Sequence, residues 1–321
     1  MILSASRRTD IPAFYTEWFM NRIREGSVCV INPFNKNQIS RVNITPEVVD
    51  CMVFWSKDPR PLMKHLDEID ALGYKYYFQF TITAYRRDVE LNLNKKEIIK
   101  TFIELSEKIG KEKVILRYDP IFLTDNYSFD FHLKALDVLC DRLKDHTNKI
   151  VISFLDDYRK VASNMKGFNL QQLSERSMIE IAGALVEIAS RYHLPMETCA
   201  EKIDLEELGI NHAKCIDGEL IEKIVKYPIK HKDKKDKNRD YCGCMKCIDI
   251  GQYDTCVHNC LYCYANVNKE RARSNYKLHN PKSPVLFGDY NIDLVKDRKD
   301  VKSFRIAEEH FDKIKLFEDE A

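Results

Sequence analysis

The sequence contains no apolar run long enough to cross a bilayer, so we expect no membrane partner. Its first residues, MILSASRRTDIP, lack a basic region followed by a long apolar one, which predicts no signal peptide and a cytoplasmic protein whose thiols stay reduced. Internal repeats and low-complexity segments are absent. The phosphate-binding P-loop, the nucleophile elbow and the H-E-x-x-H motif are also missing, so kinase and hydrolase functions have no support.

Neither positive nor negative charge predominates, because the net charge is only +1 over 321 residues. No overall field therefore draws the protein to nucleic acid, and such a partner is not favoured, although it is not excluded. The most charged stretch, KHKDKKDKNRD at residues 230–240, mixes both signs and is expected to be a linker or lid. Charged residues at 31% and apolar residues at 44% are typical of a globular protein.

Short β-rich runs alternate with longer amphipathic stretches along the first two thirds of the chain. The expected strands are Ile2–Ser6, Cys51–Ser56, Tyr76–Thr83, Val114–Tyr118, Ile150–Leu155 and Leu194–Cys199. The expected helices are Tyr15–Glu25, Pro61–Leu72, Lys95–Ile109, Phe129–Asp145, Ser174–Tyr192 and Glu219–Tyr227. Strands that alternate with helices of this length predict a parallel sheet with right-handed crossovers.

Six such βα units favour an α/β fold of the partial (β/α)6 barrel type, similar to an incomplete TIM barrel. The alternative is a doubly wound sheet, but no G-x-G-x-x-G follows the first strand. We expect the barrel over residues 1–229, the charged linker over 230–241 and a cysteine-rich iron–sulfur segment over 242–273. A C-terminal tail over 274–321 is expected to contain one helix, Val301–Leu316.

Eleven cysteines are present, and six of them lie between residues 242 and 263. A disulfide framework is not expected where thiols stay reduced, so the cluster indicates a metal site. Cys256, Cys260 and Cys263 have C-x3-C-x2-C spacing, with which three thiolates can bind three irons while a fourth keeps an open position. The alternative is structural zinc completed from Cys242, Cys244 and Cys247, although zinc sites usually use two C-x2-C-type pairs.

This spacing, with Tyr262 just before the last cysteine, resembles the motif of the radical S-adenosylmethionine superfamily. The resemblance implies a partial (β/α)6 barrel and a 4Fe–4S cluster whose unique iron binds S-adenosylmethionine. It also implies reductive cleavage to a 5′-deoxyadenosyl radical, an unidentified substrate, and an electron donor such as flavodoxin or ferredoxin. Tyr262 is expected to lie beside the cluster or the adenine.

The motif departs from the superfamily in its position, because it follows the sixth unit instead of the first strand. The loop after the first strand contains Arg7, Arg8 and Asp10, which are then available to hold an anionic substrate or to anchor the cysteine segment. SRRTDIPAFY, RYDP and the cysteine segment together resemble the bacterial DUF1848 family, whose function is unknown. The cluster either folds over the barrel mouth or serves as a plain electron-transfer centre.

Polar residues follow every expected strand, which predicts one polar mouth at the carboxyl ends of the strands. If S-adenosylmethionine binds there, the candidate residues are Arg117, Asp119, Ser153 and Glu197. Arg117 and Asp119 share one face of their strand, so an internal ion pair is an equal alternative.

The other cysteines suggest a second site, formed by Cys199, Cys215, Cys242 and Cys244, with Cys247 as a spare. It would hold a second iron–sulfur cluster or zinc. Alternatively, Cys199 and Cys215 are ordinary buried cysteines, as we expect for Cys29, Cys51 and Cys140. Two further function classes stay open: a non-catalytic electron-transfer or nucleic-acid-binding module, and a zinc-stabilised barrel enzyme without radicals.

Overall fold

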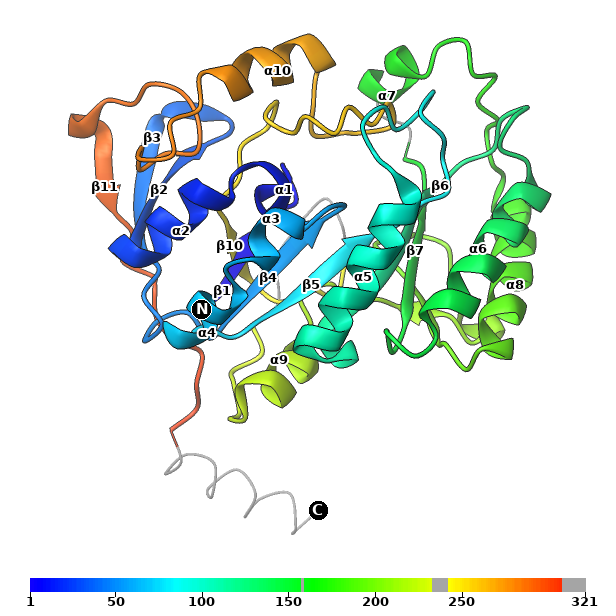
Figure 1. Cartoon of the computed structure of the whole chain (residues 1–321), viewed down its shortest axis with the longest axis horizontal. Coiled ribbons are helices and arrows are strands. Elements are labelled where there is room, and N and C mark those ends of the chain that lie inside the picture. Colours follow the sequence, from blue (N-terminus) through cyan, green and yellow to red (C-terminus); the bar gives the residue numbers. More distant parts are fainter. Residues whose placement is uncertain (157–158, 233–241, 308–321) are drawn as a thin grey trace.

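Eight parallel strands form the main sheet, in a computed structural model that describes residues 1–156, 159–232 and 242–307 (Figure 1). Their order across the sheet is β10-β1-β4-β5-β6-β7-β8-β9. They span Ile2–Ala5 (β1), Cys51–Ser56 (β4), Tyr76–Thr81 (β5), Val114–Ile121 (β6), Ile150–Phe154 (β7), Met196–Thr198 (β8), Asn211–His212 (β9) and Cys247–Asp249 (β10). The predicted α/β class with a parallel sheet is confirmed.

The six predicted strands, β1 and β4 to β8, lie side by side in the order in which they occur along the chain. A doubly wound sheet would reverse this order partway, and no such reversal occurs among these six strands. Two short strands extend the sheet, β10 beside β1 and β9 beside β8, so β10 and β9 form its two edges in the described part of the chain.

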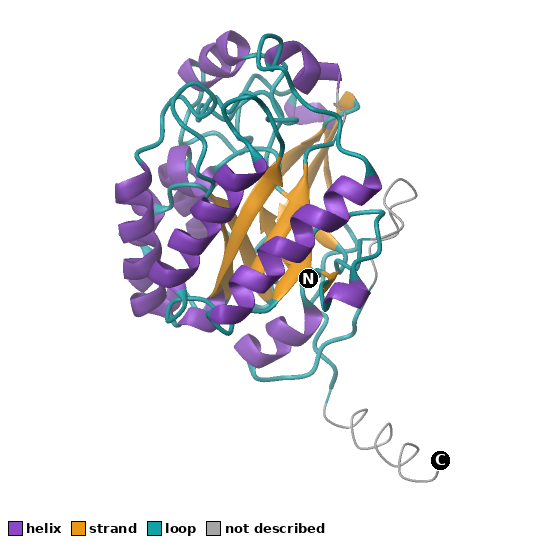
Figure 2. Cartoon of the chain, turned by 90° about the vertical axis from the view of Figure 1, so that its right-hand side faces the viewer, coloured by secondary structure: helices purple, strands orange, loops and turns teal. Residues whose placement is uncertain are grey.

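Helices cover the outside of the strands, and loops gather at one end of the sheet (Figure 2). In α5, the buried residues Ile98, Phe102, Leu105 and Ile109 recur at helical spacing and form the face toward the sheet. The α-helices are α1 (Ile11–Phe14), α2 (Thr16–Glu25), α3 (Arg60–Met63), α4 (Leu66–Ala71), α5 (Lys95–Ile109), α6 (Phe129–Leu143), α7 (Arg159–Asn164), α8 (Glu175–Arg191), α9 (Gly218–Val225) and α10 (Lys269–Lys277). Short 3-10 helices are η1 (Lys111–Lys113), η2 (Glu206–Leu208) and η3 (Ile292–Leu294).

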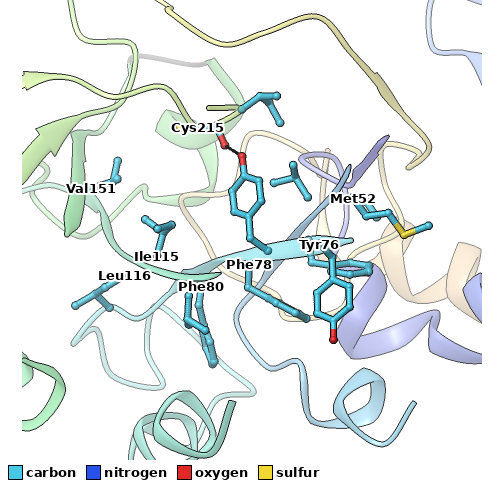
Figure 3. Close-up of a cluster of buried hydrophobic side chains, with 14 of the residues drawn as sticks. Met52, Tyr76, Phe78, Phe80, Ile115, Leu116, Val151 and Cys215 are labelled. Atoms are coloured by element: carbon cyan, nitrogen blue, oxygen red, sulfur yellow. Dashed lines mark hydrogen bonds between the residues drawn. The ribbon is translucent and has the colours of Figure 1, made fainter. Parts of the chain in front are cut away.

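The sheet has two chemically different faces, and β5 shows the contrast. Phe78 and Phe80 point toward the helices, where Phe80 packs on Phe102 of α5 with ring centroids 5.1 Å apart. Cys215 lies on the opposite side (Figure 3), where its carbonyl accepts a hydrogen bond of 2.7 Å from the Tyr77 hydroxyl. Because side chains alternate along a strand, this second face also receives Gln79.

A small second sheet contains strands in the order β11-β3-β2, with β2 at Ser27–Asn32, β3 at Asn35–Asn43 and β11 at Val295–Asp297. The expected linker 230–241 and tail helix Val301–Leu316 fall largely on residues 233–241 and 308–321, outside the described residues. Residues 301–307 form no helix, and Arg305 makes a β-bridge to Ile229 instead. None of the described helices has both the length and the apolar character needed to span a membrane.

Candidate metal and cofactor site

The C-x3-C-x2-C loop follows β10 and runs over the carboxyl ends of β1, β4 and β5. In Figure 1 this gold segment crosses the upper end of the sheet between α10 and α7. The Leu261 amide donates a 3.0 Å hydrogen bond to the Val89 carbonyl, and Cys260 forms a β-bridge with Glu90, both beyond β5. The Tyr264 hydroxyl donates a 2.8 Å bond to the Arg7 carbonyl beyond β1.

Asp10 connects this loop to the strand ends through its side-chain hydrogen bonds. One carboxylate oxygen accepts from the Ala13 amide at 3.0 Å, which caps α1, and from the Ser56 hydroxyl at 2.8 Å. The other oxygen accepts from the Lys57 amide at 2.8 Å and lies 2.7 Å from His258 Nε2. Asp10 is 5% exposed, and through these bonds its side chain joins three loops, which matches the expected role of anchoring the cysteine segment.

The three cysteines lie in one electrostatic neighbourhood. Burial raises the pKa of Cys256 well above its ordinary value, and the neighbouring Cys263 and Cys260 add to this shift. Burial also raises the pKa of Cys260 to about 12, although Lys57 opposes this shift. Thiols with such raised pKa values ionise when a metal centre compensates their charge. Three thiols from one short loop therefore fit a cluster that leaves one iron open.

Tyr262 anchors the loop in a small aromatic core. Its ring packs against Tyr85 and Phe122, with centroids 5.6 and 5.9 Å apart, and only 7% of the residue is exposed. Its hydroxyl donates to the buried carboxylate of Glu90. Tyr262 thus lies in a buried aromatic core against which Cys260 also packs.

Glu90 is fully buried and gathers cations beneath the loop. It accepts a 2.9 Å bond from Lys57 Nζ, a 2.7 Å bond from the Thr83 hydroxyl and a further bond from Lys95 Nζ. Although burial raises the pKa of Glu90, Lys57 and Lys95 lower it to about 2, so the carboxylate is ionised. Lys57 and Lys95 both lower the pKa of the Cys260 thiol, whereas Glu90 raises it.

Arg7 and Arg8 hold the segment that leads from β10 to the cysteines. The Arg7 amide donates a 3.0 Å bond to Asp249, and its guanidinium Nη2 lies 3.4 Å from Cys247 Sγ. Arg8 Nη1 donates to the Gly251 carbonyl at 3.3 Å. Of the two expected roles of these arginines, the contacts match anchoring of the cysteine segment.

Arg117, Asp119 and Ser153 come together at the ends of β6 and β7. Arg117 is 4% exposed and forms a bidentate pair with Asp119, with distances of 3.2 and 2.6 Å, and Ser153 Oγ lies 3.5 Å from Asp119. Glu197 does not join them, because it pairs with Lys149, just before β7, at 2.9 Å.

Glu201 lies near Asp119 at this end of the sheet instead. It accepts a 2.8 Å bond from the Phe154 amide. Burial raises the pKa of Glu201 to about 7, to which the charges of Asp156, Cys199 and Asp119 contribute. Glu201 belongs to the polar stretch ETCAE, but no local sequence pattern distinguishes it as a functional residue.

The second cysteine set lies on the inner face of the sheet. Cys199 and Cys215 have their sulfur atoms 3.3 Å apart, and Arg117 Nη1 lies 3.0 Å from Cys215 Sγ. Cys244 Sγ accepts a 3.4 Å hydrogen bond from the Ile216 amide, next to Cys215, and Cys242 influences the thiol of Cys244. The four residues predicted for this site thus lie near one another. Cys29, Cys51 and Cys140 are buried in the hydrophobic core, as predicted.

No three His, Cys, Asp or Glu side chains in the described ranges already surround a point where one metal ion could lie. Ligation at either cysteine set therefore requires thiol side chains to rotate toward a common centre. A cavity of about 320 Å³ opens beside the first set and is lined by Phe14, Asp58, Val257, Asn259, Arg273 and Tyr276 among others. Asn259 has a φ of 59°, a left-handed conformation that asparagine tolerates and that turns the loop between Cys256 and Cys260.

Comparison with known proteins gives one match. A family model described as a domain of unknown function, DUF1848, matches residues 2–265. The matched range contains the whole main sheet and both cysteine sets. No curated protein and no solved structure matches the chain.

Proposed function

The chain belongs to the DUF1848 family, and we propose that it is a radical S-adenosylmethionine enzyme. In this proposal Cys256, Cys260 and Cys263 hold a 4Fe–4S cluster at the mouth of a partial (β/α)6 barrel. A cluster of this kind, when bound, supplies the electron that cleaves S-adenosylmethionine to a 5′-deoxyadenosyl radical. Such chemistry requires reduced thiols, so we place the protein in the cytoplasm, with flavodoxin or ferredoxin as the electron donor.

The observation that carries the proposal is the position of the cysteine loop. In parallel α/β folds, ligands bind at the carboxyl ends of the strands. The loop reaches this end through His258 on Asp10 and Tyr262 on Glu90, although it follows β10, the last strand of the main sheet along the chain. The motif comes late in the chain, but it lies at the same end of the sheet as the loop that follows β1.

The residues below the loop have defined tasks in this proposal. Lys57 and Lys95 offset the negative charge of a thiolate-bound centre next to Cys260. The aromatic core around Tyr262 keeps water from that side of the loop. Arg117 holds Asp119, which together with Ser153 and Glu201 presents polar groups for the cofactor or the substrate.

The test is anaerobic purification followed by iron and sulfide analysis and electron paramagnetic resonance with and without S-adenosylmethionine. We expect labile sulfide, a reduced-state signal that changes when S-adenosylmethionine is added, and formation of 5′-deoxyadenosine with dithionite. The C256A/C260A/C263A variant should lose all three, whereas Cys140→Ala, at a core position, should keep them. A cluster that yields no 5′-deoxyadenosine would favour an electron-transfer protein, and protein without iron or sulfide would refute both.

A further inference from the structure

The structure contains a second group of cysteines that the proposed function does not use. We infer that Cys199, Cys215, Cys242 and Cys244 form a closed site for one Zn²⁺ that links the two edges of the parallel sheet. This inference does not rest on the proposed function. It is carried by sulfur contacts, by the position of the cysteines in the sheet and by the donors that surround them.

The four cysteines lie near one another. The sulfur atoms of Cys199 and Cys215 are 3.3 Å apart, Cys244 Sγ accepts from the amide of Ile216, the residue after Cys215, at 3.4 Å, and Cys242 lies two residues before Cys244 and influences its thiol. A tetrahedral zinc with Zn–S bonds of about 2.3 Å has its sulfurs roughly 3.8 Å apart. Binding of one ion therefore requires the thiol side chains to rotate toward a common centre and to release their protons.

The contact between the Cys199 and Cys215 sulfurs favours a single ion over a cluster. In an iron–sulfur cluster each thiolate binds its own iron, so the metal atoms and sulfides keep the thiolates apart. A single ion instead needs its ligands to converge. Four cysteines also fill a tetrahedral zinc completely, which is the arrangement of a structural site and not of a catalytic one.

The cysteines come from both edges of the sheet. Cys199 directly follows β8, and Cys215 follows the edge strand β9, while Cys242 and Cys244 precede the other edge strand, β10. The two edge segments already meet, because the Met245 amide donates a 3.0 Å bond to the Ile216 carbonyl. A closed barrel has no free edges. Zinc here would join β8 and β9 to β10, and would so link the two edges that further strands connect in a closed barrel.

Polar donors surround the sulfurs and favour thiolate ligands. The Arg117 guanidinium lies 3.0 Å from Cys215 Sγ, and the Ile216 amide donates to Cys244 Sγ at 3.4 Å. The Cys215 carbonyl is fixed by Tyr77 at 2.7 Å and by Gln79 Nε2 at 3.0 Å. Charged and amide donors of this kind orient the ligands of metal sites and tune their basicity.

The experiment measures metals in the full chain in which the other set has been removed, the C256A/C260A/C263A variant. Zinc by mass spectrometry should be one ion per chain without labile sulfide, and zinc-edge X-ray absorption should show four sulfur ligands at about 2.3 Å. Adding Cys199→Ser or Cys244→Ser to this background should lower zinc more than tenfold. Adding Cys51→Ser or Cys140→Ser, at core positions outside the group, should leave zinc unchanged.

Three results would overturn the inference. Iron and sulfide retained by the C256A/C260A/C263A variant would assign a second cluster to these residues. Absence of zinc together with a Cys199–Cys215 disulfide would assign a dithiol pair. Zinc with nitrogen or oxygen ligands would place the ion elsewhere. The absorption measurement needs no substitution within the group, so misfolding of the serine variants does not affect it.

Discussion

His258 Nε2 lies 2.7 Å from a carboxylate oxygen of Asp10, and both side chains are almost fully buried. The two residues are separated by most of the chain, since Asp10 follows the first strand and His258 lies between two cysteines. The contact therefore fixes the C-terminal cysteine loop to the N-terminal strand end. It gives the histidine a positioning role that the sequence left open.

We expect Asp10→Asn to weaken the anchoring of the cysteine loop. An asparagine amide turns a donor toward groups that already donate, and a hydrogen bond to a charged group contributes about 1.5–3 kcal/mol to stability. Urea unfolding should show a loss of this size, and iron content after anaerobic purification should fall. Asp58→Asn is the control, because Asp58 pairs with the exposed Arg60. Unchanged stability and iron content in Asp10→Asn would contradict the anchoring role.

Lys57→Met tests the charge beside Cys260. Lys57 opposes the raised pKa of the Cys260 thiol, so it stabilises negative charge there. Without this cation, adding an electron to a cluster on Cys260 becomes less favourable, and its reduction potential should fall. A redox titration followed by electron paramagnetic resonance measures the shift. Lys100→Met, on the exposed face of α5, should leave the potential unchanged; equal potentials in both variants would place Lys57 outside the range of the cluster.

His132 makes the stability of the aromatic core pH-dependent. Burial lowers the pKa of His132 from 6.5 to about 4, and its ring nitrogens lie 2.8 Å from the Tyr118 hydroxyl and 3.0 Å from the Phe122 carbonyl. Below pH 6.5 the unfolded chain binds a proton that the folded chain does not. The free energy of unfolding should therefore fall by about 2–3 kcal/mol as the pH drops from 6.5 to about 4.

His132→Gln should remove this part of the pH dependence. Urea unfolding at pH 7.5 and pH 4 gives the fall in stability for each protein, and the fall should be smaller in the variant by about 2–3 kcal/mol. His146→Gln is the matched control, since His146 lies outside this core just beyond α6. Parallel pH curves for wild type and His132→Gln would show that His132 is protonated in the folded protein.

Local periodicity predicted six of the eight strands of the main sheet and the long helices that cover it. The helix predicted at Lys95–Ile109 matches α5, because its buried residues recur at helical spacing. The hairpin of β2 and β3 was missed because β3, NKNQISRVN, is mostly polar and exposed. Strands β9 and β10 have two and three residues. Strands this short are defined by their neighbours in the sheet, which no local pattern shows.

The candidate site likewise contains residues that a local pattern predicts and residues that only folding brings together. The spacing of Cys256, Cys260 and Cys263 is local, so the sequence displays it directly. Glu90 and Lys57 come from two different loops and meet only after folding, and a single glutamate in RRDVELNLNKK has no distinguishing pattern. Glu197 was expected at the strand ends because it lies on the last predicted strand, but its carboxylate pairs with Lys149, which precedes β7.

Arg117 contacts both candidate sites. It binds Cys215 of the second cysteine set and Asp119 at the strand ends. Arg117→Met should leave the partly buried Asp119 without its cation and lower the stability by less than the about 3–5 kcal/mol that a fully buried pair costs. Loss of a donor next to a metal ligand typically weakens binding 10- to 100-fold. Competition with a chelator in the C256A/C260A/C263A background should show zinc lost at correspondingly lower chelator concentrations.

The double variant Arg117→Met/Asp119→Asn separates the effect on stability from the effect on zinc affinity, since it removes the unpaired carboxylate. It should recover part of the stability but none of the zinc affinity. Recovery of zinc affinity would mean that Arg117 acts on the site only through the stability of the fold.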